Sequence, residues 1–146
     1  MAELANQYDI DVRFIEMMPM YDSGDFGANS FVANRIVLDK IPELIPVSSG
    51  EGVARMYQKP GAKGRIGLIS PVNDHFCMQC NRIRVTADGK LKPCLHSSDE
   101  LSVKGLELEE MKRVMQEAIL AKPFCHAVLS ATERSQAGRN MNQIGG

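Results

Sequence analysis

The sequence predicts an α+β fold, and three segments support that prediction. Residues 11–18 predict a strand, because apolar and charged residues alternate there. Residues 81–95 predict an antiparallel hairpin, since the same alternation continues on both sides of Asp88-Gly89, a dipeptide typical of type I′ turns. Residues 106–121 predict an amphipathic helix, because apolar residues recur there at helical spacing.

The other segments predict shorter elements. Residues 3–8 predict a short helix, and residues 53–58 and 64–70 predict two further strands. Gly, Asp, Asn and Ser dominate residues 21–30, which is typical of a loop, whereas the periodicity of residues 31–38 is ambiguous. The apolar face of the predicted helix near the C-terminus consists of Leu108, Met111, Val114, Met115, Ala118 and Ile119.

Length and composition narrow the class of protein. The 146 residues are 44% hydrophobic and 24% charged, which argues for a globular domain, or part of one, and against a disordered chain. Lys and Arg number 17 against 18 Asp and Glu, so a generally basic nucleic-acid binder is not expected. The N-terminus does not resemble a signal peptide, and no apolar run approaches the roughly 20 residues that span a bilayer. We therefore expect a cytoplasmic protein without membrane partners.

Cysteine spacing indicates a metal site. Cys77 and Cys80 form a Cys-x-x-Cys motif, whose two sulfurs can bind one ion or neighbouring irons of one cluster. The predicted hairpin runs out and back, and so returns Cys94 to this pair. Three free cysteines can also be small buried hydrophobic residues, but this spacing favours ligands.

The spacing does not identify the metal. Structural zinc takes four ligands, and His75, His96 or Cys125 could supply a fourth. A 4Fe-4S cluster can be held by three cysteines, which leaves one iron open. Both kinds of site remain compatible with the residues.

Two arginines follow the cysteine pair. Arg82 and Arg84 are two residues apart on a predicted strand, so both side chains should project from one face. Guanidinium groups suit phosphate recognition, and next to a metal they could hold an anionic ligand against it. The alternative is that both arginines belong to a solvated strand face.

The segments around the cysteines resemble a known family. Residues 67–71 (GLISP) and 75–95 (HFCMQCNRIRVTADGKLKPCL) resemble the second cluster motif of the GTP 3′,8-cyclase family, the radical SAM enzymes called molybdenum cofactor biosynthesis protein A. Residues 14–19 (FIEMMP) resemble the last strand of the barrel of these enzymes. The C-terminal tail is similar at Lys122-Pro123, His126, Arg139, Met141 and the closing IGG of residues 144–146.

The resemblance implies two domains. Residues 1–20 would be the last strand of an incomplete (β/α) barrel, the end of the radical SAM partial barrel. Residues 21–146 would form the C-terminal domain, an antiparallel sheet with packed helices that holds a second 4Fe-4S cluster and the GTP site. The ligands of that cluster would be Cys77, Cys80 and Cys94.

The resemblance also assigns contacts to substrate and cofactor. Arg82, Arg84 and the backbone at Ile83 would contact GTP, whose purine would bind the open iron. Met18 would touch S-adenosylmethionine, and Gly145 and Gly146 would reach into the active site. Cys125 matches no ligand of the family and is expected to be structural.

In the full-length enzyme, a lyase, a 5′-deoxyadenosyl radical would abstract a ribose hydrogen from GTP. The product would be (8S)-3′,8-cyclo-7,8-dihydroguanosine 5′-triphosphate, which passes to cyclic pyranopterin monophosphate synthase. S-adenosylmethionine and a first 4Fe-4S cluster belong to an N-terminal radical SAM half, whose Cys-x-x-x-Cys-x-x-Cys motif is absent from these residues. We therefore expect the chain alone to be inactive, with no catalytic residue of its own. The full-length form could be a homodimer.

Two alternatives belong to other classes of function. One is a small zinc-binding Cys-x-x-Cys module that binds nucleic acid or protein. The other is a structural domain whose metal only stabilises the hairpin. The near-neutral charge disfavours nucleic acid, and the length of the matching cysteine segment favours the cyclase family.

Overall fold

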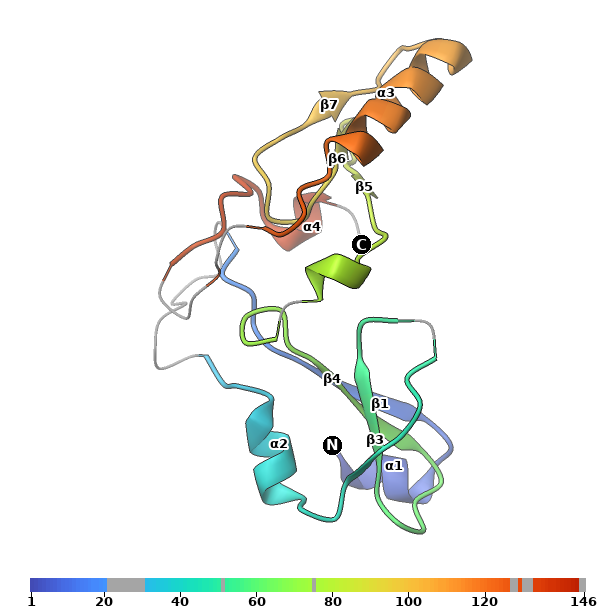
Figure 1. The fold of residues 1–146 in the computed structure, drawn as a ribbon, viewed down its shortest axis with the longest axis vertical. Helices are drawn as coiled ribbons and strands as arrows, with labels where there is room; N and C mark the ends of the chain where they lie inside the picture. The colour runs from blue at the N-terminus through green and yellow to red at the C-terminus, as the bar shows by residue number, and fades with distance from the viewer. Residues whose placement is uncertain (21–30, 51, 75, 127–128, 130–132, 145–146) are drawn as a thin grey trace. The chain divides into compact units, whose positions relative to one another are not determined.

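The computed structural model describes residues 1–20, 31–50, 52–74, 76–126, 129 and 133–144 (Figure 1). These residues form two compact units. The first unit comprises Met1–Met17 and Ser30–Phe76, and the second comprises Met18–Asn29 and Cys77–Gly146. The loop predicted over residues 21–30 lies outside the described residues.

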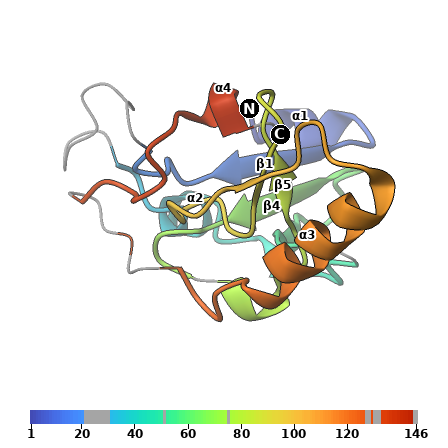
Figure 2. The same ribbon diagram turned by 90° about the horizontal axis from the view of Figure 1, so that it is seen from above.

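The first unit is a mixed sheet of four strands. Its elements are α1 (Glu3–Gln7), β1 (Asp11–Ile15), α2 (Arg35–Lys40), β2 (Ile45–Pro46), β3 (Arg55–Gln58) and β4 (Arg65–Ile69). The strand order is β1-β4-β3-β2, in which β1 runs parallel to β4 and the other neighbours are antiparallel. Figure 2 shows β1 beside β4. The strands predicted over residues 53–58 and 64–70 are thereby confirmed, and the ambiguous segment 31–38 contains the beginning of a helix.

Alternating side chains build the core of this unit. Val12 and Phe14 of β1 pack with Ile66 and Leu68 of β4, and Ala5 of α1 is buried among them. Because successive strand side chains point to opposite faces, the alternation that predicted the strand also selects which residues enter the core.

A buried carboxylate lies where β1 ends. The strand stops at Ile15 rather than at residue 18, because Glu16 enters a polar cluster. Its carboxylate accepts hydrogen bonds from the backbone N–H groups of Asn34 (3.1 Å), Val72 (3.2 Å) and Asn73 (3.2 Å), and from the side-chain amide of Asn73 (2.9 Å). The alternation of apolar and charged residues in the sequence does not reveal that Glu16 leaves the strand to make these contacts.

The second unit contains the predicted hairpin. β5 (Arg84–Val85), β6 (Lys90–Lys92) and β7 (Leu101–Ser102) form an antiparallel sheet in the order β5-β6-β7. The turn type differs from the prediction, since Gly89 has a φ of 79° but Asp88 does not have a positive φ. The backbone N–H of Thr86 donates to the Lys90 carbonyl over 2.8 Å, so the loop has three residues, a length typically closed by a glycine in the left-handed region.

Helices complete the second unit. The predicted helix is confirmed as α3 (Leu108–Leu120), which packs on β6; η1 (Cys77–Gln79) and α4 (Met141–Ile144) are single turns (Figure 1). On its expected apolar face Ala118 is buried, whereas Ile119 is exposed.

Helices with one mixed and one antiparallel sheet confirm the α+β class, and the described residues contain no closed barrel. None of the helices within the described ranges is long and apolar enough to cross a membrane. The domain boundary at residue 20 stays a prediction.

Gly64 should be intolerant of a side chain. A Cβ atom there would lie against the backbone oxygens of Tyr8 and Ile10, which are fixed by hydrogen bonds of the same segment. Gly64→Ala should therefore lower the free energy of unfolding by about 1–3 kcal/mol or more, the usual cost of overpacking. Urea denaturation followed by circular dichroism measures this change. The exposed neighbouring variant Lys63→Ala is the control and should stay within about 0.5 kcal/mol of the unmodified chain; equal midpoints for both variants would contradict the prediction.

Candidate metal and nucleotide site

The Cys-x-x-Cys motif forms one tight turn. The short helix η1 begins at Cys77, and the backbone N–H of Cys80 donates to the Cys77 carbonyl over 3.1 Å. Both residues are half-buried. The turn therefore presents two thiols from one short piece of backbone, as the motif predicts.

Lys122 connects this turn to the base of the hairpin. Its Nζ lies 2.7 Å from the Arg82 carbonyl oxygen, 3.2 Å from the Pro93 carbonyl oxygen and 3.5 Å from the Cys80 Sγ. One ammonium group thus contacts the end of the cysteine turn, the chain that leads into β5 and the chain that leaves β6. The three segments predicted to form the site meet at this side chain.

Cys94 follows β6 at the base of the hairpin. β5 and β6 pair Arg84 with Lys92, and the carbonyl of Pro93, the residue before Cys94, contacts the same Lys122 ammonium group as the Cys80 thiol. The approach of Cys94 to the cysteine turn stays a prediction. Cys94 is half-buried, like the two cysteines of the turn.

The three thiols fit an iron-sulfur cluster by their chemistry. The sulfurs of Cys77, Cys80 and Cys94 do not all lie within 4.8 Å of one another. In a 4Fe-4S cluster each cysteine binds a different iron, so its ligand sulfurs need not crowd around one point as they must around a single ion. The separation of these three half-buried thiols is compatible with a cluster, and the ligand set stays a prediction.

The predicted GTP contacts lie at the start of the hairpin. Arg84 is the first residue of β5 and is half-buried, as is Ile83, whereas Arg82 is exposed and precedes the strand. The carbonyl of Arg82 is one of the acceptors of Lys122, so this backbone is fixed beside Cys80. That both guanidinium groups share one face stays a prediction.

Met18 lies in a small apolar cluster of the second unit. Met18 and Leu95, the residue after Cys94, both pack against the buried residues Met20, Ala137 and Ile144. Ile144 directly precedes Gly145 and Gly146, which lie outside the described residues. The predicted S-adenosylmethionine contact, a neighbour of a predicted ligand and the base of the predicted glycine tail therefore share one cluster.

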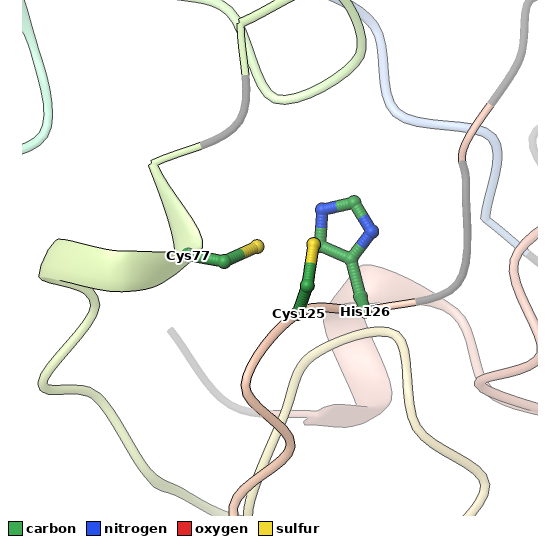
Figure 3. Close-up of side chains that lie close together, drawn as sticks. All are labelled: Cys77, Cys125 and His126. Atoms are coloured by element: carbon green, nitrogen blue, oxygen red, sulfur yellow. The ribbon is translucent and has the colours of Figure 1, made fainter.

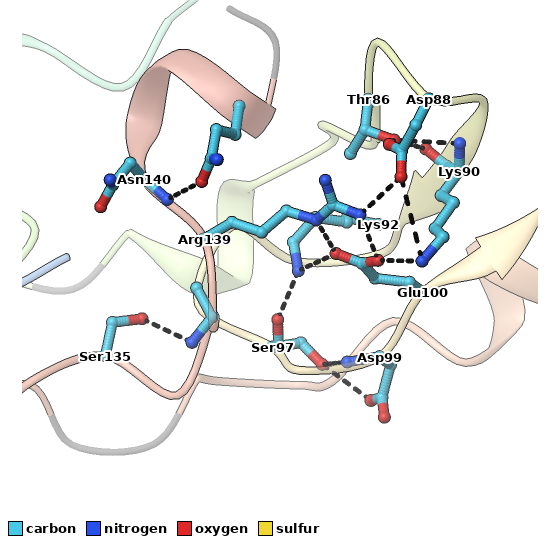
Figure 4. A network of polar contacts seen from close by, with 12 residues as sticks. Thr86, Asp88, Lys90, Lys92, Ser97, Asp99, Glu100, Ser135, Arg139 and Asn140 are labelled. Carbon is cyan, nitrogen blue, oxygen red and sulfur yellow. Dashed lines mark hydrogen bonds and ion pairs between the residues drawn. The ribbon is translucent and has the colours of Figure 1, made fainter. Parts of the chain in front are cut away.

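A network of charged residues holds the C-terminal segment to the hairpin (Figure 4). The Arg139 guanidinium donates to the Glu100 carboxylate over 2.5 and 2.8 Å and to Asp88 over 2.9 Å. Glu100 also pairs with Lys90 at 3.0 Å and with the fully buried Lys92 at 3.5 Å. Hydrogen bonds from Arg139, then Lys90, and the charge of Lys92 lower the pKa of Glu100 to about 2. Arg139 therefore holds the C-terminal segment against the hairpin.

A second group of side chains that could hold a metal ion includes Cys77 of the cysteine turn. Cys77 Sγ, Cys125 Sγ and a ring nitrogen of His126 all lie within 4.8 Å of one another (Figure 3). Burial raises the pKa of the Cys77 thiol; a hydrogen bond with the backbone of His126 opposes that shift, and the Cys125 and Cys80 thiols add to it. Of the fourth ligands considered from sequence, Cys125 belongs to this group and His96 is buried and bonded to Ser135, whereas His75 lies outside the described residues.

Sequence reasoning missed the roles of Lys122 and His126. A lysine near the end of a helix and a single histidine are unremarkable, because Cys80, which Lys122 contacts, is 42 residues away in the chain and Cys77, which lies beside His126, is also distant. The only local signal was the Cys125-His126 pair itself, two adjacent soft ligands on a short connection after α3.

Comparison with known proteins identifies the family of the chain. The sequence pattern of the family described as Molybdenum Cofactor Synthesis C matches residues 10–128. The chain belongs to this family. The match spans the cysteine turn, the hairpin, α3 and Lys122, which are the elements that form the site.

Three curated relatives of the chain are each named GTP 3′,8-cyclase. The GTP 3′,8-cyclase of Alkaliphilus metalliredigens is 44% identical over 149 residues, and that of Alkaliphilus oremlandii is 40% identical over 148 residues; each match covers 99% of this chain and 46% of the relative. The GTP 3′,8-cyclase of Pelotomaculum thermopropionicum is 37% identical over 157 residues, which is all of this chain and 47% of the relative. The resemblance inferred from the cysteine segment is thereby confirmed. The chain spans just under half the length of these relatives.

Acid should weaken the Arg139 network within a defined pH window. The pKa of Glu100 falls from an ordinary value of 4.5 to about 2 on folding, so the carboxylate stabilises the folded chain fully above its ordinary pKa and loses that effect as the pH falls toward 2. Arg139→Gln should therefore lower the urea midpoint at neutral pH, and the difference should shrink steadily on acidification. Urea denaturation across this range measures it, with the exposed Arg113→Gln as control. A difference that is independent of pH would contradict the assignment.

Proposed function

We propose that this chain is the part of a GTP 3′,8-cyclase that binds GTP and the second 4Fe-4S cluster. The observation that supports this most directly is the Lys122 ammonium, which contacts the cysteine turn, the backbone of the arginine segment and the carbonyl before Cys94. The full-length enzyme would be a lyase of molybdenum cofactor biosynthesis that converts GTP to (8S)-3′,8-cyclo-7,8-dihydroguanosine 5′-triphosphate. This chain's share of that reaction would be to hold and orient the nucleotide.

In this proposal the cluster ligands are Cys77, Cys80 and Cys94. When bound, the cluster supplies one iron without a cysteine ligand, to which the purine of GTP can bind. Lys122 places a positive charge 3.5 Å from the Cys80 Sγ, beside one of the proposed ligands. The same lysine fixes the hairpin base, because it donates to the Arg82 carbonyl in the segment before β5 and to the Pro93 carbonyl directly after β6.

The arginine segment would recognise the nucleotide. Arg82 and Arg84 would pair with phosphate oxygens, since a guanidinium offers several N–H donors in a fixed plane. The backbone at Ile83 lies between them and would supply a further contact. Their nearness to the cysteine turn lets one bound molecule reach both the iron and the arginines.

The remaining assignments concern the intact enzyme. Met18 would contact S-adenosylmethionine, and Gly145 and Gly146 would enter the active site. The radical would arise at a first 4Fe-4S cluster in the N-terminal radical SAM half. The product would pass to cyclic pyranopterin monophosphate synthase. We propose no nucleic-acid or membrane partner, a cytoplasmic location and, for the intact enzyme, the capacity to form a homodimer.

Iron binding should depend on three of the four cysteines. Ser in place of Cys77, Cys80 or Cys94 should each abolish a stable cluster, because three thiolates leave no spare ligand. Iron and sulfide analysis after anaerobic reconstitution measures this. Cys125→Ser is the matched control and should retain iron and sulfide in full. A complete cluster in Cys94→Ser would refute the proposed ligand set.

GTP binding should depend on the arginine segment. Arg82→Ala and Arg84→Ala should each weaken GTP binding to the cluster-loaded chain by roughly 1.5–3 kcal/mol, the scale of a hydrogen bond to a charged group. Lysine at either position should restore binding only in part, because it lacks the planar fork. Isothermal titration under anaerobic conditions gives the affinities, and Arg113→Ala on α3 is the control. Affinities equal to that control would assign both arginines to the solvated face.

The 146 residues alone should not perform radical chemistry. They contain four cysteines, of which three are assigned to one cluster, so the chain offers no ligand set for the cluster that reduces S-adenosylmethionine. Reconstituted and reduced chain, mixed with S-adenosylmethionine and GTP, should yield neither 5′-deoxyadenosine nor cyclised GTP by mass spectrometry. Catalytic formation of 5′-deoxyadenosine would refute this division of labour.

A further inference from the structure

The side chains of Cys77, Cys125 and His126 form a compact set of donors that shares Cys77 with the proposed cluster ligands and adds Cys125 and His126. The ligand atoms of these three residues all lie within 4.8 Å of one another. Among the described residues, no other set of three cysteine, histidine or acidic side chains is found so close together. Figure 3 shows the Cys125 thiol and the His126 ring on neighbouring residues of one connection, next to the Cys77 thiol of the cysteine turn. Two sulfurs and one imidazole nitrogen are ligands that zinc prefers.

From this arrangement we propose that the cluster-free chain binds one Zn²⁺ through Cys77, Cys125 and His126. Zinc–sulfur bonds of about 2.3 Å and zinc–nitrogen bonds of about 2.0 Å place tetrahedral ligands about 3.5–3.8 Å apart. The three donor atoms already lie within 4.8 Å of one another, so rotation of side chains closes the remaining distance. Water occupies the fourth position, as in other zinc sites with three protein ligands.

The surroundings favour such a site. The His126 ring packs edge-on against the ring of His96, with 4.9 Å between centroids. His96 is buried, and its Nδ1 is 2.9 Å from the Ser135 Oγ, which fixes that ring in turn. A ligand whose orientation is set by its neighbours loses less entropy on binding. Cys125 is exposed, so the ion can enter from solvent.

The zinc ion and the iron-sulfur cluster compete in this protein. Both need the thiolate of Cys77, which cannot serve the two sites at once. Zinc bound by Cys125 and His126 therefore blocks assembly of the cluster until it is removed. This consequence depends on the cluster assignment of the proposed function, whereas the zinc site itself does not.

Zinc affinity of the metal-free, reduced chain tests the site. Competition with a chromophoric chelator should give one Zn²⁺ per chain, and Cys125→Ser and His126→Asn should each bind at least tenfold more weakly. Cys94→Ser is the matched control, a cysteine of the same unit outside the group, and should keep its affinity within about twofold. Co²⁺ in place of zinc should show thiolate-to-cobalt absorption that is reduced in Cys125→Ser and unchanged in Cys94→Ser. Equal zinc affinity of Cys125→Ser and the unmodified chain, or an equal loss in Cys94→Ser, would overturn the proposal.

A second measurement separates this site from the cluster. Zinc added before reconstitution should slow iron uptake by the unmodified chain, and Cys125→Ser should take up iron at the same rate with and without zinc. Circular dichroism of each metal-free variant verifies that it is folded. Iron content without zinc reports on the proposed cluster alone, so failure of the cluster and failure of the zinc site give different results. Inhibition by zinc that persists in Cys125→Ser would overturn the competition.

Discussion

The Glu100 carboxylate faces the side chains of Lys90, Lys92 and Arg139, and the second unit depends on this grouping of charges. Lys92 is fully buried, and burial of an ammonium group is costly unless its charge is paired and its hydrogen bonds are made. Glu100 supplies the charge, and the Ser97 carbonyl accepts a hydrogen bond from the Lys92 Nζ at 2.7 Å. The residue after Glu100 begins β7, so the same contact aligns β6 with its neighbour. Arg139 attaches the C-terminal segment to this group of charges, and α4 of that segment packs into the apolar cluster around Met18.

Glu16 and Glu100, one in each unit, are carboxylates whose hydrogen-bond partners differ in kind; Glu16 is buried and Glu100 is partly buried. Glu100 is surrounded by cations, whereas Glu16 in the first unit accepts four hydrogen bonds from amide groups. The Asn34 side chain extends that cluster, because its amide donates to the carbonyls of Phe14 (3.2 Å) and Ile69 (2.8 Å). The polar cluster thus joins the ends of β1 and β4 to the segments that follow them. Buried polar groups of this kind specify one arrangement, since each alternative leaves a group unsatisfied.

Much of the secondary structure followed from local patterns, and most of the site did not. The hairpin could be predicted because alternation and Asp88-Gly89 are local, and α3 because its apolar spacing is local. The turn type was wrong, since a three-residue loop and a two-residue loop can use the same dipeptide. Met18 as the end of a strand was also wrong, because the buried contacts of Glu16 come from residues 34, 72 and 73. Cys77 and Cys80 could be paired from their spacing, but the contacts of Lys122 and of His126 depend on how distant segments pack, which no local pattern records.

The bond between Arg139 and Asp88 limits how far the hairpin can vary in length. Loop tips of hairpins commonly tolerate insertion and deletion, because they contact little else. This hairpin is constrained at both ends. In the proposed site its base returns Cys94 to the cysteine turn, and its loop brings Asp88 within 2.9 Å of Arg139. Removing one residue pair would preserve the strand register but withdraw Asp88 from the C-terminal segment. The number of residues between Cys80 and Cys94, thirteen, therefore sets the distance between the cysteine site and the contact of Asp88 with Arg139.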